Sequence, residues 1–182
     1  MCMVYIALLR GVNVAGKPTV SMAALKACFE GLGFGDVRTY INSGNVIFRA
    51  AQATNDALAS QIEAALAESF TPGVRALIKS RDELQRLGDA IPETWVNDTA
   101  FRCEVIFLWP EIDRPEVLGE LPSNPELEDV RYAPGAALWH VSRSLVTKSR
   151  MTQIIGTPLY QQMTIRNLTT VRKLLALANE IT

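Results

Sequence analysis

The feature that most constrains the fold is a continuous apolar run near the start of the chain, Met3 to Leu9, which stops at Arg10-Gly11. Apolar residues at successive positions, rather than at alternate ones, are typical of a strand that is buried on both faces. The run therefore predicts a central strand of a sheet. The 182 residues, of which 48% are hydrophobic and 20% charged, are enough for one globular domain or two small ones with a real core.

The rest of the first half alternates between helical and extended patterns. Ser21 and Thr54 can each cap an amphipathic helix, and Ser80 with Glu83 forms a capping-box pattern for a third. Asn and Gly between two short apolar runs at residues 42–45 favour a hairpin. The predicted order is βαββαβ followed by a helix, with strands at 3–9, 37–41, 46–48 and 74–78.

The second half repeats this order after a connector at residues 92–98. Strands are predicted at 103–109, 130–132, 137–141 and 163–165, and helices near 114–121, near 150–155 and through Val171, Leu174, Leu175 and Ala178. The fold class expected is therefore α+β, a duplicated ferredoxin-like arrangement of βαββαβ plus helix, twice. We expect repeats at 1–92 and 99–182 that pack as one compact unit.

The cysteine content and the charge distribution of the sequence indicate which kinds of protein and of site to expect. Three widely spaced cysteines offer neither a disulfide framework nor a metal-binding Cys-x-x-Cys pair, and no apolar run reaches the roughly 20 residues that span a bilayer. We expect a cytoplasmic protein that binds no membrane, metal or cofactor. Residues 131–179 hold no acid, and they carry seven basic residues: Arg131, Arg143, Lys148, Arg150, Arg166, Arg172 and Lys173. This stretch indicates either a solvated basic surface or an anion site.

The loop after the first predicted strand resembles a phosphate-binding P-loop. Gly11-x-x-x-x-Gly16-Lys17 supplies glycines and a lysine at the right spacing, but Pro18 stands where a hydroxyl for magnesium is needed. Proline also lacks an N–H to donate, and the next helix is predicted only after Ser21. A nucleotide-dependent phosphotransferase with an altered P-loop is therefore an alternative rather than the leading hypothesis.

A looser anion site is the leading hypothesis. A glycine-containing loop can present N–H groups to an anion beside cationic side chains, and the predicted ligand-binding residues are Arg10, Gly11, Asn13, Lys17, Ser43, Asn45, Lys148 and Arg166. Arg166 precedes the last predicted helix, whose positive end favours an anion. The alternative is structural: the glycines and asparagines serve only turn geometry, and Arg166 pairs with an acid.

Two other functions have weaker support. Tyr5 on the first predicted strand imitates the base-stacking aromatic of an RNA-recognition domain, but the third strand supplies only Phe48, so packing is the favoured role of Tyr5. His140 is the only histidine and has no Cys or Asp at a catalytic spacing, so a structural or surface role is favoured. No catalytic constellation is recognisable. An RNA or protein interaction module remains an alternative, and the oligomeric state is undetermined.

Three phrases in order resemble a known family. Leu8-Leu9-Arg10-Gly11-Val12-Asn13-Val14 with Gly16-Lys17, then residues 37–46, then Arg166-Asn167 with Thr170-Val171 are similar to the bacterial family called domain of unknown function 1697, over almost the whole chain. Lys148-Ser149-Arg150 resembles the family's Arg-Ser-Lys phrase with the basic residues exchanged. The resemblance implies a duplicated ferredoxin-like α+β architecture and no established activity. We expect an anion-binding protein whose site draws on both repeats.

Overall fold

A computed structural model describes residues 2–13, 19–70 and 72–181. The chain divides into two compact units, one formed by Met1–Gln85 with Leu174–Thr182 and the other by Arg86–Lys173. The sequence-based boundaries put the end of the chain in the second repeat, whereas the structure groups these last residues with the first unit.

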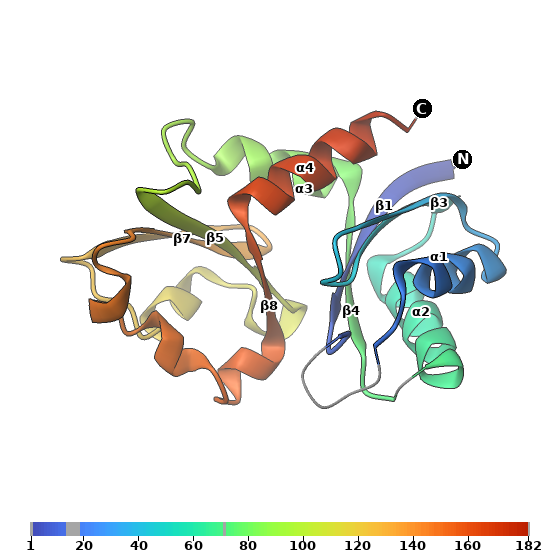
Figure 1. Ribbon diagram of the computed structural model, residues 1–182, viewed down its shortest axis with the longest axis horizontal. Helices are drawn as coiled ribbons and strands as arrows, with labels where there is room; N and C mark the ends of the chain where they lie inside the picture. The colour runs from blue at the N-terminus through green and yellow to red at the C-terminus, as the bar shows by residue number, and fades with distance from the viewer. Residues whose placement is uncertain (1, 14–18, 71, 182) are drawn as a thin grey trace. The chain divides into compact units, whose positions relative to one another are not determined.

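The first unit is built on a four-stranded antiparallel sheet (Figure 1). Its strands are β1 (Cys2–Arg10), β2 (Gly35–Tyr40), β3 (Asn45–Ala51) and β4 (Arg75–Ser80). Their order in the sheet is β2-β3-β1-β4, so the apolar run predicted to be a central strand has a neighbour on each side. This is the strand order of a ferredoxin-like βαββαβ unit.

Two helices cover one face of this sheet (Figure 1). They are α1 (Met22–Gly31) and α2 (Asn55–Ser69), and each begins where the sequence predicts: Ser21 accepts a hydrogen bond from the Ala24 N–H, and Thr54 accepts one from the Ala57 N–H. Fully buried Phe29 of α1 and Phe48 of β3 meet edge to face, with ring centroids 5.4 Å apart. The apolar stripes of the helices thus form the core together with the facing side of the sheet.

Tyr5 belongs to this helix-side core. Its side chain is 2% exposed, its ring stacks on Phe48, and its hydroxyl exchanges hydrogen bonds with the backbone of Ala53. The packing role favoured by the sequence is therefore confirmed. Because side chains alternate along a strand, Leu9 shares the helix side with Tyr5 while Leu8 and Arg10 project from the other face.

The capping box predicted at Ser80 and Glu83 is present at the start of α3 (Arg81–Ala90). The Ser80 N–H donates to Glu83 Oε2 over 2.7 Å, and the Glu83 N–H donates to Ser80 Oγ over 3.2 Å. Burial disfavours the charged form of Glu83, but hydrogen bonds from the Ser80 N–H and from the amide of Asn55 outweigh it and hold the pKa of this carboxyl below its ordinary value.

The second unit repeats the strand order of the first. Its strands are β5 (Phe101–Leu108), β6 (Glu128–Ala133), β7 (Ala136–Ser142) and β8 (Met163–Asn167). They form an antiparallel sheet in the order β6-β7-β5-β8, which corresponds strand for strand to the first sheet. The expected α+β fold with two similar halves is therefore confirmed, and the strand order of both halves agrees with the ferredoxin-like arrangement.

The helices predicted near 114–121 and 150–155 are wrong in type. Short 3₁₀ helices stand in their place: η1 (Pro110–Ile112), η2 (Pro115–Gly119), η3 (Val146–Lys148), η4 (Met151–Ile154) and η5 (Leu159–Gln162). Pro115 and Gly119 interrupt the first region, and Gly156 and Pro158 follow the second; these residues break an α-helical ladder but permit single 3₁₀ turns. Ile112, Val117 and Met151 from these turns still pack against Trp139 and Ile106 of the sheet.

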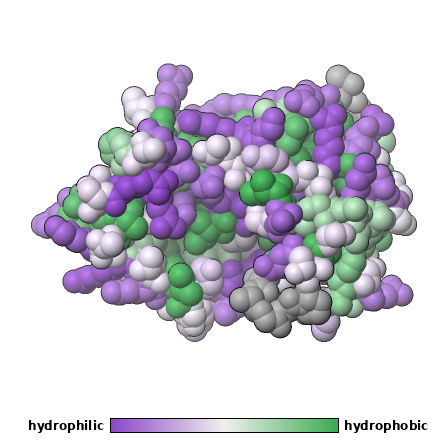
Figure 2. All heavy atoms as spheres, viewed as in Figure 1, coloured by the Kyte–Doolittle hydropathy of each residue, from purple (hydrophilic) through white to green (hydrophobic). Residues whose placement is uncertain are grey.

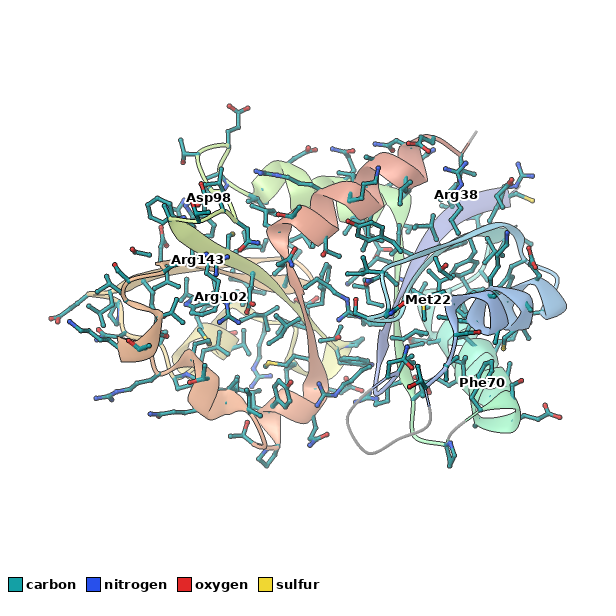
Figure 3. All side chains as sticks on the ribbon, viewed as in Figure 1. Met22, Arg38, Phe70, Asp98, Arg102 and Arg143 are labelled. Atoms are coloured by element: carbon teal, nitrogen blue, oxygen red, sulfur yellow. The ribbon has the colours of Figure 1, made fainter. Side chains whose placement is uncertain are left out.

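The closing helix is α4 (Leu168–Asn179), which begins where predicted. Asn167 caps it by accepting a hydrogen bond from the Thr170 N–H over 2.8 Å. Beyond α4, Glu180 pairs with Arg38 of β2 at 2.6 Å, and both residues belong to the first unit (Figure 3). This ion pair ties the end of the chain to the edge strand of the first sheet.

Hydrophilic side chains are spread over the face viewed in Figure 2, with hydrophobic ones in separate small groups. Among the described residues, three large hydrophobic side chains are exposed: Ile41, Phe101 and Ile155. Within the same residues, none of the helices combines the length and the apolar character needed to cross a bilayer.

Candidate functional site

Arg10 is the last residue of β1, where it lies opposite Arg75 of β4 in the antiparallel register. Leu9 and Ala76, their neighbours, belong to the helix-side core, so strand alternation places both arginines on the face without α1 and α2. Directly opposed residues of an antiparallel pair have Cβ atoms about 4.5–5.5 Å apart. The end of β1 therefore places two arginines opposite each other on adjacent strands.

The chain then turns through two left-handed residues. Gly11 has a φ of 90° and Asn13 a φ of 53°. A Cβ on Gly11 would lie 3.4 Å from the Gly73 carbonyl oxygen, so glycine serves both the backbone angle and the close approach of the next loop.

The side chain of Asn13 bonds to the backbone of Val20 and of Asn42. Its Oδ1 accepts the Val20 N–H over 2.7 Å, and its Nδ2 donates to the carbonyls of Val20 over 3.0 Å and of Asn42 over 3.1 Å. Both amide hydrogens are used within the protein. Asn13 therefore positions the loop, in agreement with the structural role that the sequence left open.

The turn between β2 and β3 lies against the same loop. The Leu9 N–H donates to the Gly44 carbonyl over 2.8 Å. Gly44 has a φ of 75°, and a Cβ there would stand 2.9 Å from the Leu9 Cβ, so no larger residue fits without a shift. Ile41 also has a positive φ, 49°, although its side chain is β-branched and 48% exposed. Such a backbone costs on the order of 1–2 kcal/mol and marks a strained turn beside the loop.

Ser43 and Asn45 complete this turn. Asn45 is fully buried, and its Nδ2 donates to the Tyr40 carbonyl over 3.1 Å and to Ser43 Oγ over 2.9 Å. Asn45 therefore braces the turn, while exposed Ser43 stands at its tip. The structure brings five predicted residues into one loop cluster on the first unit: Arg10, Gly11, Asn13, Ser43 and Asn45.

The structure does not place the three other predicted residues, Lys17, Lys148 and Arg166, in this cluster. Lys17 lies outside the described residues. Lys148 is exposed at the end of η3, and Arg166 lies on β8; both belong to the second unit. That these residues share one site with Arg10 stays a prediction.

Arg166 has a buried side chain that is tied to its own strand. It donates to Thr164 Oγ1 and to the Ile165 carbonyl, each over 2.9 Å. Desolvation by burial lowers the pKa of its guanidinium to about 10, which leaves it cationic at neutral pH.

The serine next to Lys148 has a structural role. Ser149 is buried and donates to Glu128 Oε2 over 2.6 Å. The same oxygen accepts the indole N–H of Trp139 over 2.6 Å, and the Asn124 N–H donates to the other oxygen over 2.6 Å. This buried carboxylate fastens the segment after β7 to the sheet.

Sequence reasoning missed Arg75, Ile41 and Asn42. Arg75 could have been found, because the start of the fourth strand lies opposite the end of the first in a ferredoxin-like unit. The strained φ of Ile41 had no signal in the sequence. Nor did the contact of Asn13 with the Asn42 carbonyl, which joins residues 29 positions apart.

His140 and the potential metal ligands are further chemically reactive side chains among the described residues. His140 is partly buried, which lowers the pKa of its imidazole below the ordinary value, and its ring stacks on Trp95 and Phe101. Residues 2–13, 19–70 and 72–181 contain no group of three His, Cys, Asp or Glu side chains placed to hold a metal ion.

Comparison with known proteins agrees with this architecture. The solved structure of the conserved bacterial protein SP0830 from Streptococcus pneumoniae is similar over 98% of this chain and 99% of that one, with 25% sequence identity and a TM-score of 0.82. No curated protein matches the sequence. The model of a family described as "Protein of unknown function (DUF1697)" matches residues 3–139, a range that includes the whole loop cluster. The third of the three phrases, at residues 166–171, lies outside this range. The chain belongs to the DUF1697 family, as the first two phrases suggested.

Proposed function

We propose that this protein binds a phosphate-bearing or other anionic small molecule at the loop cluster of the first unit. The observation that carries the proposal is the opposition of Arg10 and Arg75 across β1 and β4, at the mouth of the glycine loop. Each guanidinium offers five N–H donors in a fork that matches phosphate or carboxylate oxygens.

The like charges of this pair favour an anion. Two cations directly opposite each other on a sheet repel, and an anion that contacts both relieves the repulsion. A neutral ligand does not lessen this repulsion. The arrangement therefore selects for negative charge rather than for a particular molecular shape.

The backbone supports the same conclusion. Left-handed residues are a component of the backbone nests whose N–H groups bind anions, and Gly11 and Asn13 both have positive φ. The hydrogen bonds of Asn13 hold residues 13 and 20 together before a ligand arrives, and groups that are fixed in advance lose less entropy on binding. In this proposal Arg10 and Arg75 contact the ligand, Gly11 permits its approach, and Asn13 and Asn45 position the loops.

Lys17, Lys148 and Arg166 remain predicted contributors. Alanine substitution of each tests that prediction separately from the arginine pair. A loss of anion binding in Lys148→Ala or Arg166→Ala would support the two-part site that the charge asymmetry indicates.

A thermal-shift screen tests the proposal. Inorganic phosphate, ATP, GTP and a sugar phosphate would be added at low and moderate salt to the wild type, to Arg10→Ala/Arg75→Ala and to Arg114→Ala, an exposed arginine of the second unit that serves as matched control. We expect at least one anion to raise the Tm of the wild type and the control but not of the double variant, with a smaller effect in higher salt.

The proposal is wrong if no anion raises the Tm, or if the increase persists in the double variant. Magnesium-dependent release of phosphate from ATP would instead support the phosphotransferase alternative.

A further inference from the structure

An aromatic stack on the second unit points to a second kind of ligand. Phe101 of β5 and Trp95 of the preceding connector both stack on His140 of β7, with ring centroids 4.8 Å from the imidazole and interplanar angles of 19° and 15°. Arg131 of β6 extends the stack, with its guanidinium carbon 5.0 Å from the centre of the Trp95 ring.

The stack lies on the face of the sheet opposite the 3₁₀ helices. Ile106 and Trp139 face those helices in the core. Phe101 is five positions from Ile106 and His140 is one position from Trp139, so both face the other way, because side chains alternate along a strand. Phe101 and His140 come from the first and third strands of a ferredoxin-like unit. RNA-recognition domains place their base-stacking aromatics on these two strands.

An open groove adjoins the stack. Its volume is about 520 Å³, within the size range of small-molecule sites. Phe101 is 38% exposed at this groove, so its ring is accessible to a ligand. The lining consists of Phe101, Pro125, Leu127, Glu128, Asp129, Val130, His140, Val141 and Ser142.

Hydrogen bonds hold the backbone beside Phe101. Asp98 Oδ1 accepts the N–H groups of Ala100 and Phe101, each over 2.8 Å, and Arg143 donates to the Asp98 carbonyl (Figure 3). These bonds fix the backbone at the start of β5, where Phe101 stands. A stacking residue that is fixed in advance loses little entropy when a ligand binds.

The polar groups of the groove select the kind of ring. The lining residues include acceptors in Asp129 and Ser142 but no lysine or arginine. The charge of Asp129 is balanced by Arg131, whose guanidinium lies 2.6 Å away. His140 Nε2 is buried and has no hydrogen-bond partner among the described residues, and burial lowers the pKa of the ring below its ordinary value.

We propose that this groove binds a nucleobase with an exocyclic amino group, stacked on Phe101 with its amino edge toward Asp129. Adenine, cytosine and guanine have such an edge, whereas uracil does not. The base comes either from a free nucleoside or nucleotide or from a single-stranded nucleic acid. The site is separate in chemistry from the loop cluster of the first unit, because it recognises the base rather than the phosphate.

The test is an NMR titration of the full-length protein with adenosine, AMP and uridine. Adenosine carries no phosphate, so its binding is independent of the proposed anion site. We expect adenosine and AMP to bind this groove with affinities within about twofold of each other, because no lysine or arginine lines it and Arg131, beside it, is paired with Asp129. Uridine should bind more weakly. Shifts should concentrate at β5, at β7 and at the start of β6.

Substitutions at Phe101 separate stacking from general apolar contact. Phe101→Leu should weaken adenosine binding about 5- to 150-fold, the range found for loss of a base-stacking aromatic. Phe101→Tyr, which keeps the ring, should retain binding, and so should Ile155→Ala, which removes an exposed apolar side chain outside the groove. Far-ultraviolet circular dichroism checks that each variant is folded.

An adenine hexanucleotide identifies the source of the base. Tighter binding of the hexanucleotide than of adenosine supports a single strand, and equal binding supports a free nucleoside or nucleotide. The proposal is overturned if adenosine at millimolar concentration shifts no resonance, if uridine binds equally well, or if Phe101→Leu binds adenosine like the wild type.

Discussion

Substitution of Asn13 tests how the loop after β1 is held. The side chain makes three hydrogen bonds that join the two ends of the loop and attach it to the β2–β3 turn. A typical intramolecular hydrogen bond contributes about 1 kcal/mol net. Since one of the three is exposed, loss of all of them should lower the free energy of unfolding by about 2–3 kcal/mol.

Because the backbone is left-handed at residue 13, two substitutions can separate the contribution of the hydrogen bonds from the cost of the backbone conformation. Glycine adopts the φ of 53° without steric cost, so Asn13→Gly should show mainly the loss of the hydrogen bonds. Asn13→Ala adds about 1 kcal/mol for the left-handed conformation. Asn13→Asp keeps the acceptor for the Val20 N–H and should be the least destabilised of the three.

The assay is urea unfolding at equilibrium followed by far-ultraviolet circular dichroism. Asn42→Ala is the matched control, because Asn42 contributes its backbone carbonyl to the loop and keeps it in the variant. The expected order of stability is wild type and control, then Asn13→Asp, Asn13→Gly and Asn13→Ala. Equal stability of Asn13→Gly and the wild type would refute the positioning role of this side chain.

Three further predictions concern buried or perturbed groups. Glu128 accepts three hydrogen bonds, whereas the amide in Glu128→Gln can accept only at its oxygen. The free energy of unfolding, measured by tryptophan fluorescence, should therefore fall by about 2–3 kcal/mol. A decrease below about 0.5 kcal/mol would contradict the network with Ser149. The lowered pKa of Glu83 means that its contribution to stability is present above the ordinary value of 4.5 and is lost as the pH falls through the lower folded-state value. Urea unfolding between pH 3 and 7 should thus show a steeper acid loss in the wild type than in Glu83→Gln, and parallel curves would rule this out. Burial raises the pKa of Cys103 to about 11, so iodoacetamide at pH 8 should label exposed Cys2 first and Cys103 only after unfolding. Mass spectrometry of the labelled peptides measures both rates, and equal rates in the native protein would contradict the burial of Cys103.

Much of the fold follows from local signals in the sequence. Several predicted elements are present in the structure: the central strand at Met3–Leu9, the helices capped by Ser21 and Thr54, and the helix that begins at the Ser80-Glu83 capping box. These signals are local, because a cap or a buried strand is encoded by neighbouring residues. The strand order then followed from the βαββαβ sequence of elements.

The helices of the second half could not be predicted in the same way. The apolar spacing around Val117 and Ile154 suits a helix face, and both side chains are indeed buried. Pro115 and Gly156 nevertheless limit the chain to short 3₁₀ turns. Periodicity thus predicted which residues face the core but not the type of helix.

The candidate site was predictable only in part. Arg10, Gly11 and Asn13 stood out because glycine and a cation follow a strand, and the structure places them beside the β2–β3 turn. The side chains of Asn13 and Asn45 donate hydrogen bonds to backbone carbonyls. These contacts form only in the folded chain, so composition and spacing do not predict them. Arg75, 65 positions along the chain, lies opposite Arg10 in the sheet; the predicted strand order places the two strand ends together, and the register adds the residue-by-residue pairing.

The central claim, that Arg10 and Arg75 together bind an anion, is tested most directly by isothermal titration calorimetry with the most stabilising anion of the thermal screen. Hydrogen bonds to charged groups contribute about 1.5–3 kcal/mol, so each single alanine variant should bind about 10- to 150-fold more weakly than the wild type. The double variant should show no measurable heat of binding at the same concentrations. Binding by the double variant with the affinity of the wild type would contradict the account.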